Sequence, residues 1–470
     1  MDRQELFHRL EAVVGADHVS MDLTDRIAHS FDATRQQHLP DIVVHPGETA
    51  EVAAVVRLAA QARIPILARG AGSGFTGGSL PVRGGIVVVL TRMNRIVEID
   101  TDNLIAVVEP GVVTARLQQE VERLGLFYPP DPASRAFSTL GGNVAECAGG
   151  PRCLKYGVTR DYVLGLEVVM PNGAVIRTGG RVMKNVVGYD LTRLFVGSEG
   201  TLGIVTRITL RLLPKPEARA TMLAAFNSID GAAQAVSAII RGRIIPVALE
   251  FMDRSSIDCV RRSHSVDLPE SCRAVLIIEV DGERAQLAPQ VKRIKEIVRA
   301  FDILETRVAQ TADEAEAIWQ LRRNVSPSLR RLGPNKFNED IVVPRSLVPE
   351  MVRRLEEIGR QCEVPIVTFG HAGDGNIHVN VMVDLEQPGT KERVDRALDA
   401  IFRAAVELGG SISGEHGIGT AKARYIGLEV DAATMAVMRG IKEVLDPDNI
   451  MNPGKIFPED LPGPAETKER

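Results

Sequence analysis

Two histidines and a glutamate lie among glycines in the second half of the chain. His371 and His378 are seven residues apart, and Glu415 directly precedes His416. His378 opens a run of alternating valines, 378–383, which predicts a strand. A single histidine between glycines is usually structural, but two imidazoles and a carboxylate with open positions suit zinc, manganese or iron(II). The pattern therefore predicts a divalent metal site at His371, His378 and Glu415, with zinc as the first choice.

The segments around these motifs alternate between strand-like and helix-like patterns. At residues 213–216, two prolines prevent a strand or helix from continuing, and beyond them glycine becomes scarce. Apolar runs predict strands at 221–226, 247–251 and 274–280, and longer amphipathic runs predict helices at 229–240, 284–300, 311–331 and 347–361. This alternation predicts an α+β domain in which the helices cross over between strands.

The first half of the chain concentrates its glycines in three loops. Residues 69–78 hold five glycines in ten positions, directly after the apolar strand 64–68. Such a loop lets backbone N–H groups approach an anion closely, but its spacing matches neither a Walker A loop nor a dinucleotide fingerprint. Alone, it is equally well explained as a surface loop. Two further glycine loops, at 139–157 and 197–205, indicate a long, bent ligand.

The composition narrows the class of protein. A chain of 470 residues predicts two or three packed units, and the net charge of -5 gives no sign of nucleic-acid binding. The apolar runs are too short to span a membrane, and the N-terminal residues lack the pattern of a secretory signal. These features predict a cytoplasmic protein. The five cysteines include no CxxC pair, so no zinc ribbon or iron–sulfur ligand set is expected.

The order of these motifs, over residues 40–458, resembles the FAD-linked oxidases of the vanillyl-alcohol-oxidase (PCMH-type) superfamily. The resemblance is to the branch that holds bacterial glycolate oxidase FAD subunits and D-lactate dehydrogenases. It implies an α+β fold in three parts. Residues 1–213 would form a PCMH-type FAD-binding domain of two α+β subdomains, and 214–416 a ferredoxin-like α+β substrate or cap domain with the metal site. Residues 417–470 would return to the FAD domain.

The resemblance also implies a cofactor shell. The residues that it assigns to FAD lie mainly in the three glycine loops. They are Arg69, Gly70, Gly72, Ser73, Gly74, Pro132, Ser134, Thr139, Gly142, Asn143, Gly149, Gly157, Glu199, Ile204 and Asn452. Some members of the superfamily bind FAD covalently through a histidine of the first loop. Because no histidine occurs between His45 and His264, we expect non-covalent FAD.

The implied reaction is the oxidation of a small D-2-hydroxy acid, D-lactate or glycolate, to the 2-keto acid, with D-2-hydroxyglutarate as the alternative substrate. A bound cation would lower the pKa of the substrate alcohol, and His416 would be the general base. Arg322 resembles the arginine of the family that binds the substrate carboxylate. Ser326 would lie on the same helix face as Arg322. Lys336 is a weaker candidate for binding the substrate carboxylate. Arg323 is an alternative to Arg322 as the residue that clamps this carboxylate.

Two other functions are alternatives to this one, and the metal motif argues against both. An alkylglycerone-phosphate-synthase-like transferase shares the architecture but does not depend on this metal motif, and a non-catalytic flavin subunit would be expected to lack it. The chain has no cysteine cluster to carry electrons away from a reduced flavin. We therefore expect an external acceptor: an iron–sulfur subunit, an electron-transferring flavoprotein or a quinone-linked partner. Such a partner could also hold the protein at a membrane surface.

Overall fold

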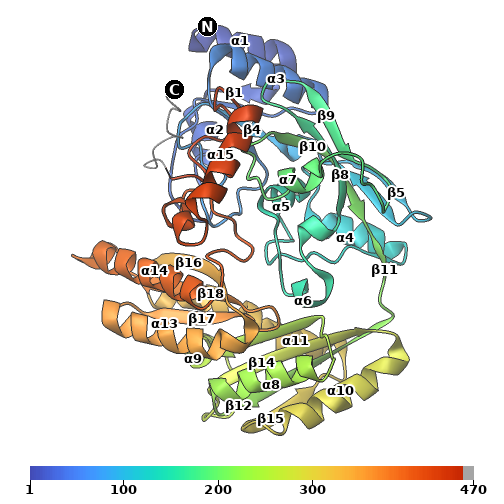
Figure 1. Cartoon of the computed structure of the whole chain (residues 1–470), viewed down its shortest axis with the longest axis vertical. Helices are drawn as coiled ribbons and strands as arrows, with labels where there is room; N and C mark the ends of the chain where they lie inside the picture. Colours follow the sequence, from blue (N-terminus) through green and yellow to red (C-terminus); the bar gives the residue numbers. More distant parts are fainter. Residues whose placement is uncertain (459–470) are drawn as a thin grey trace, which may run out of the picture. The chain divides into compact units, whose positions relative to one another are not determined.

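The computed structural model describes residues 1–458 and divides the chain into two compact units (Figure 1). Of the described residues, the first unit comprises 1–149, 158–215 and 415–458; the second comprises 150–157 and 216–414. The chain is therefore mixed α+β, as predicted. No helix within 1–458 combines the length and the apolar character that a membrane crossing requires.

The first unit begins with a small sheet whose central strands are buried. β2, β4 and β3 are parallel and almost wholly apolar, as expected for strands covered on both faces. α1 (Arg3–Val14) and α3 (Thr49–Ala62) pack against each other and share the core of this sheet (Figure 1). In sheet order the strands are β1 (Val19–Ser20), β2 (Ile42–Val44), β4 (Ile86–Val89) and β3 (Ile66–Arg69).

The second sheet of this unit is five-stranded and antiparallel. Residues of β10 alternate between buried and half-buried, the pattern of a strand with one face on a core. The strands are, in sheet order, β5 (Ile96–Asp100), β6 (Ile105–Val108), β10 (Ile204–Arg211), β8 (Val163–Val169) and β9 (Val175–Gly179). Further elements of this unit are α2 (Leu23–Ala28), α4 (Thr114–Arg123), α5 (Leu140–Glu146), α7 (Leu191–Phe195) and the paired β7 (Leu126–Phe127) and β11 (Leu213–Pro214).

The second unit is built on one seven-stranded antiparallel sheet, and the three predicted strands are confirmed as β12, β13 and β14. Its strands, in sheet order, are β15 (Ile303–Val308), β12 (Ala218–Phe226), β14 (Ala274–Gly282), β13 (Ala248–Asp253), β17 (Ile366–His371), β18 (Asn376–Val383) and β16 (Asn335–Val342). Its helices are α6 (Cys153–Tyr156), α8 (Ile229–Arg241), α9 (Arg254–Arg261), α10 (Arg284–Val298), α11 (Ala312–Arg323), α12 (Val325–Ser328), α13 (Val348–Cys362) and α14 (Thr390–Glu407).

One face of this sheet forms a core with α9 and α12, and Met252, Phe369 and Met382 point into it. The predicted single helix at 311–331 is wrong in its continuity, because α11 ends at Arg323 and α12 is a separate short helix. Pro327 explains the break in part, since proline lacks the N–H that would continue the hydrogen-bond ladder. Arg322 and Ser326 therefore belong to different helices.

The C-terminal segment packs into the first unit. α15 (Ala432–Leu445) is capped by Asp446. The buried carboxylate of Asp446 pairs with Lys442 and accepts the backbone N–H groups of Ile450 (3.1 Å) and Met451 (2.8 Å). The turn presents Ile450 and Met451 to the core beneath β3, where Ile66 donates to the carbonyl of Ile450 at 2.8 Å. One buried carboxylate thus organises the return of the chain.

Replacing Asp446 should destabilise the first unit. Asp446→Ala leaves the Lys442 ammonium buried without its counter-ion, which typically costs about 3–5 kcal/mol. Asp448→Ala is the matched control, because Asp448 lies in the same turn but is half exposed and is 3.9 Å from Arg63. Urea unfolding should show the large loss only for the first variant; equal losses would contradict this role of Asp446.

Candidate functional site

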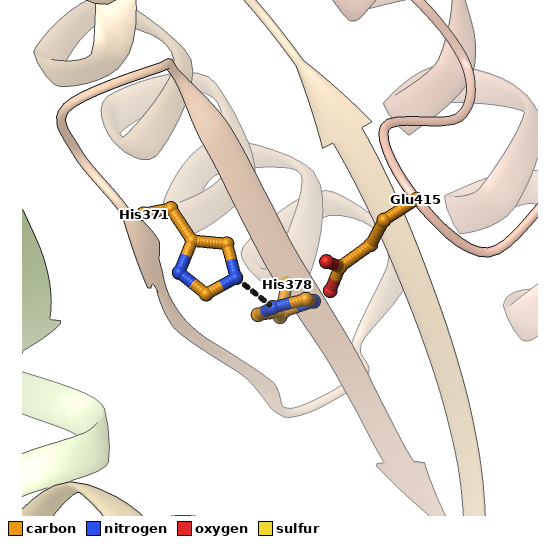
Figure 2. Close-up of side chains that lie close together, drawn as sticks. All are labelled: His371, His378 and Glu415. Atoms are coloured by element: carbon orange, nitrogen blue, oxygen red, sulfur yellow. Dashed lines mark hydrogen bonds between the residues drawn. The ribbon is translucent and has the colours of Figure 1, made fainter. Parts of the chain in front are cut away.

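The hairpin of β17 and β18 brings His371 and His378 together. Phe369 pairs with His378 across the two strands, and both side chains lie on the face that packs against α9 and α12. The turn that joins the strands requires glycine at Gly375, where φ is +88° and an added side chain would collide with the carbonyl of Val343. The Nε2 atoms of the two imidazoles lie 3.3 Å apart (Figure 2).

Glu415 completes the cluster because a buried aspartate anchors the residue before it. Asp340, on β16 beside His378, accepts the backbone N–H of Gly414 at 2.9 Å and the hydroxyl of Ser413 at 3.3 Å. Glu415 follows by one peptide bond, and its carboxylate points toward the imidazoles (Figure 2). One ligand atom from each of His371, His378 and Glu415 lies within 4.8 Å of the others.

The donor set fits a divalent cation. Two nitrogens that each lie about 2.0 Å from one tetrahedral zinc ion are about 3.3 Å apart, which matches the separation of the two Nε2 atoms. Imidazole and carboxylate are ligands that zinc, manganese and iron(II) accept. His371, His378 and Glu415 are therefore the residues that could hold a metal, and a three-ligand set leaves a position for substrate.

Glu250 is a site residue that the sequence analysis missed. It lies on β13 directly opposite His371, its side chain is fully buried, and its carboxylate is hydrogen-bonded to Nδ1 of His371. Its other oxygen accepts from Nε of Arg322 at 2.9 Å. Burial alone would raise the pKa of Glu250, but the charges and hydrogen bonds of His371 and Arg322 hold it below its ordinary value. An acidic residue inside the apolar run 247–251 was the available signal.

The cations predicted to bind substrate lie on the same face of the sheet. The guanidinium of Arg322 is 4.3 Å from the ring centre of Phe369, and Nζ of Lys336 is 3.0 Å from the hydroxyl of Ser326. Burial lowers the pKa of Lys336 to about 8, with the positive charges of Arg322 and Arg330 adding to the shift. The structure therefore groups Arg322, Ser326 and Lys336. Arg323, the alternative clamp, instead hydrogen-bonds Glu316 and Gln320 at an exposed position.

A pocket in the first unit gathers the three glycine loops. Most of the predicted cofactor residues line it: Arg69, Gly70, Gly72, Ser73, Gly74, Pro132, Ser134, Thr139, Gly142, Asn143, Gly149 and Glu199. Ile204 instead lies in the core of the small sheet, and its neighbours Gly203 and Val205 face the pocket, because adjacent strand residues point to opposite faces. Gly157 belongs to the second unit, and Asn452 is buried beside Glu199.

The glycine loops that form the walls of this pocket would let a ligand approach the backbone closely. Thr139 caps α5 through the N–H of Gly142 at 3.3 Å, and a side chain at Gly70 would collide with the Thr139 hydroxyl. Arg69 stiffens the first loop by donating to the carbonyls of Phe31 (2.6 Å) and Ser79 (3.1 Å). These loops and the apolar rings of Phe75 and Phe195 suit a large cofactor with phosphates and a flat ring.

His416 also lines the pocket. Its ring is 5.3 Å from the ring of Phe75, and its carbonyl accepts the Thr76 hydroxyl at 3.2 Å. His416 and Glu415 are consecutive, so a candidate metal ligand and a histidine of the cofactor pocket are joined by a single peptide bond.

Comparison with known protein families shows which family the chain belongs to. Residues 40–179 match the FAD binding domain family and residues 215–456 match the C-terminal domain of FAD linked oxidases. The chain belongs to the FAD-linked oxidase family and is a flavin-dependent oxidoreductase, as the sequence motifs predicted.

The chain is similar over nearly its whole length to two named relatives and to one solved structure. The chain is 45% identical to glycolate oxidase subunit GlcD of Bacillus subtilis over 98% of both chains. It is 34% identical to a D-lactate dehydrogenase of Anaerostipes hadrus over 94% of both. A structure of p-cresol methylhydroxylase with substrate bound aligns with a TM-score of 0.81 at 19% identity, covering 96% of each chain. This last likeness supports the PCMH-type fold alone.

Glu250→Gln should weaken metal binding. The amide offers a poorer acceptor to Nδ1–H of His371 and removes the charge that raises the basicity of the ring, changes that typically cost 10–100-fold in metal affinity. Competition with a chromogenic zinc chelator measures this loss. Glu279→Gln is the matched control: Glu279 is also buried in the sheet, but it accepts from Thr221 (3.0 Å) and Trp319 (2.9 Å). Unchanged zinc affinity in Glu250→Gln would rule out this role.

Proposed function

We propose that this protein oxidises a small D-2-hydroxy acid, D-lactate or glycolate, to the 2-keto acid, with non-covalent FAD and a divalent cation. The observation that carries the proposal is the shared network around Glu250, which joins the candidate ligand His371 to the cation Arg322. A 2-hydroxy acid needs both, because its carboxylate is anionic and its hydroxyl is a very weak acid. The names of the two relatives support the same substrate class.

The residues of the chain divide the work of the reaction. Arg322 and Lys336 hold the substrate carboxylate, and Phe369 and Glu250 keep the guanidinium of Arg322 in place. A cation at His371, His378 and Glu415 would supply Lewis acidity to the C2 hydroxyl. His416 then accepts the hydroxyl proton as general base. Bound FAD would supply the acceptor for the hydride that leaves C2.

The sequence supports two further parts of the proposal: that FAD is bound non-covalently, and that electrons leave to an external acceptor. The glycine loops of the pocket contain no histidine, and His416, which also lines the pocket, is assigned to proton transfer. We therefore expect FAD to be held by hydrogen bonds and packing. The chain has no CxxC pair and no cysteine cluster from which an iron–sulfur relay could be built. Electrons therefore pass to an external acceptor: an iron–sulfur subunit, an electron-transferring flavoprotein or a quinone-linked partner. The relative from Bacillus subtilis is itself named as a subunit of an oxidase.

A screen of dye reduction tests the proposal. We expect turnover with D-lactate or glycolate, far less with L-lactate, and loss of activity when a strong chelator is added while FAD stays bound. Zinc, manganese or iron(II) should restore the activity. D-2-Hydroxyglutarate is the second arm of the screen, because the cluster of Arg322, Lys336 and Arg330 could pair two carboxylates. Full activity after metal removal would contradict the mechanism but not the flavoprotein assignment.

Two histidine variants separate metal binding from proton transfer. His378→Ala should lose metal and activity together, because two remaining ligands hold a divalent ion poorly. His416→Ala should keep metal and FAD but slow flavin reduction by about 10²–10⁴-fold, the usual effect of losing a general base. Stopped-flow reduction with metal analysis measures both. Metal loss in His416→Ala would contradict the role of His416 as a base that does not bind the metal. Metal retention in His378→Ala would contradict the role of His378 as a ligand.

Lys336 should make substrate binding depend on pH. Its pKa of about 8 means that it is charged below pH 8 and neutral above. An anionic substrate binds the charged form better, so KM should rise as pH increases through 8. Lys336→Arg, which stays protonated, should remove this rise, and Lys336→Met should show the high KM at every pH. A KM profile for the wild type that is flat between pH 7 and 9 would exclude Lys336 from the clamp.

A further inference from the structure

Glu199 holds the segment that carries His416. Its carboxylate is buried and accepts two consecutive backbone N–H groups, those of Ile418 at 2.7 Å and Gly419 at 2.8 Å. Consecutive amides that converge on one anion form a backbone nest. Here the anion is an internal side chain, and the nest begins two residues after His416.

The surroundings of Glu199 determine its position closely. Its own φ is +54°, a left-handed conformation that is uncommon for a residue with a side chain. Its carbonyl accepts the amide of Asn452 at 2.7 Å, and Lys455 donates to the oxygen of that Asn452 amide at 3.0 Å. Local strain of this kind persists only where the surrounding contacts impose it, and it clusters at functional sites.

The segment itself has little freedom to move. Gly417 has a φ of +82°, and a side chain there would collide with the carboxylates of both Glu146 and Glu199. On the far side, the carbonyl of Thr76 accepts the N–H groups of Thr420 (2.8 Å) and Ala421 (3.0 Å). The backbone is therefore fixed immediately after His416, which sets the direction of the imidazole.

We propose that Glu199 is a positioning residue for His416, acting through the amides of Ile418 and Gly419. The proposal rests on the proposed function, in which His416 is the general base. Only a carboxylate satisfies this arrangement. Both oxygens accept an N–H, whereas the amide of a glutamine would direct its own NH₂ group against one of the two donors.

Glu199→Gln tests the proposal in the holoenzyme. We expect faster hydrogen exchange at the amides of 418–419 and a fall in kcat of about 10²-fold, typical of an angstrom-scale misplacement, with little change in KM. Glu167→Gln is the matched control. Glu167 is buried in the same unit and accepts from Thr49 (2.8 Å) and Arg177 (3.1 Å), so it should change neither measurement.

A double-mutant cycle distinguishes positioning from a general structural role. If Glu199 acts through His416, Glu199→Gln should have almost no further effect on kcat in the His416→Ala background. An undiminished effect in that background, or an unchanged exchange rate at 418–419, overturns the positioning role. Failure of the proposed function gives a different result: His416→Ala alone would then keep near-normal kcat, while Glu199→Gln would still accelerate exchange at 418–419.

Discussion

A carboxylate removed from water must be surrounded by cations or N–H donors, because an unpaired buried charge is very costly. Glu250 meets this requirement with His371 and Arg322, and the candidate site depends on the result. The bond to Nδ1 of His371 leaves Nε2 on the side of His378, while the bond to Nε of Arg322 holds the guanidinium over Phe369. One buried charge thus orients a candidate metal ligand and a candidate substrate clamp.

The same constraint acts twice more, on the segment that carries the other two site residues. Asp340 of the second unit accepts the N–H of Gly414, and Glu199 of the first unit accepts those of Ile418 and Gly419. Glu415 and His416 lie between these anchored positions. Buried carboxylates therefore fix the backbone on both sides of Glu415 and His416 without using either of these two side chains.

The surroundings of the Lys336 ammonium differ from those of the buried carboxylates, because charges of the same sign lie near it. Lys336 is half-buried, its Nζ donates to the Ser326 hydroxyl at 3.0 Å, and the positive charges of Arg322 and Arg330 add to the lowering of its pKa by burial. Burial and like charge both disfavour the charged ammonium, so an anionic ligand bound beside Lys336 would favour that form.

The sequence by itself determined the features that depend on local pattern. Glycine spacing indicated the pocket loops. The alternating valines predicted a strand that begins at His378, and the short interval of seven residues placed His371 close to it in sequence. Tertiary structure decided what long-range pairing controls: Glu250, Asp340 and Glu199 reach partners 72 to 220 residues away. It also decided that Arg322, not Arg323, faces the sheet, and that Gly203 and Val205, not Ile204, face the pocket. The physical reason is that neighbouring residues on a helix or strand point in different directions, and only packing selects which direction is the site.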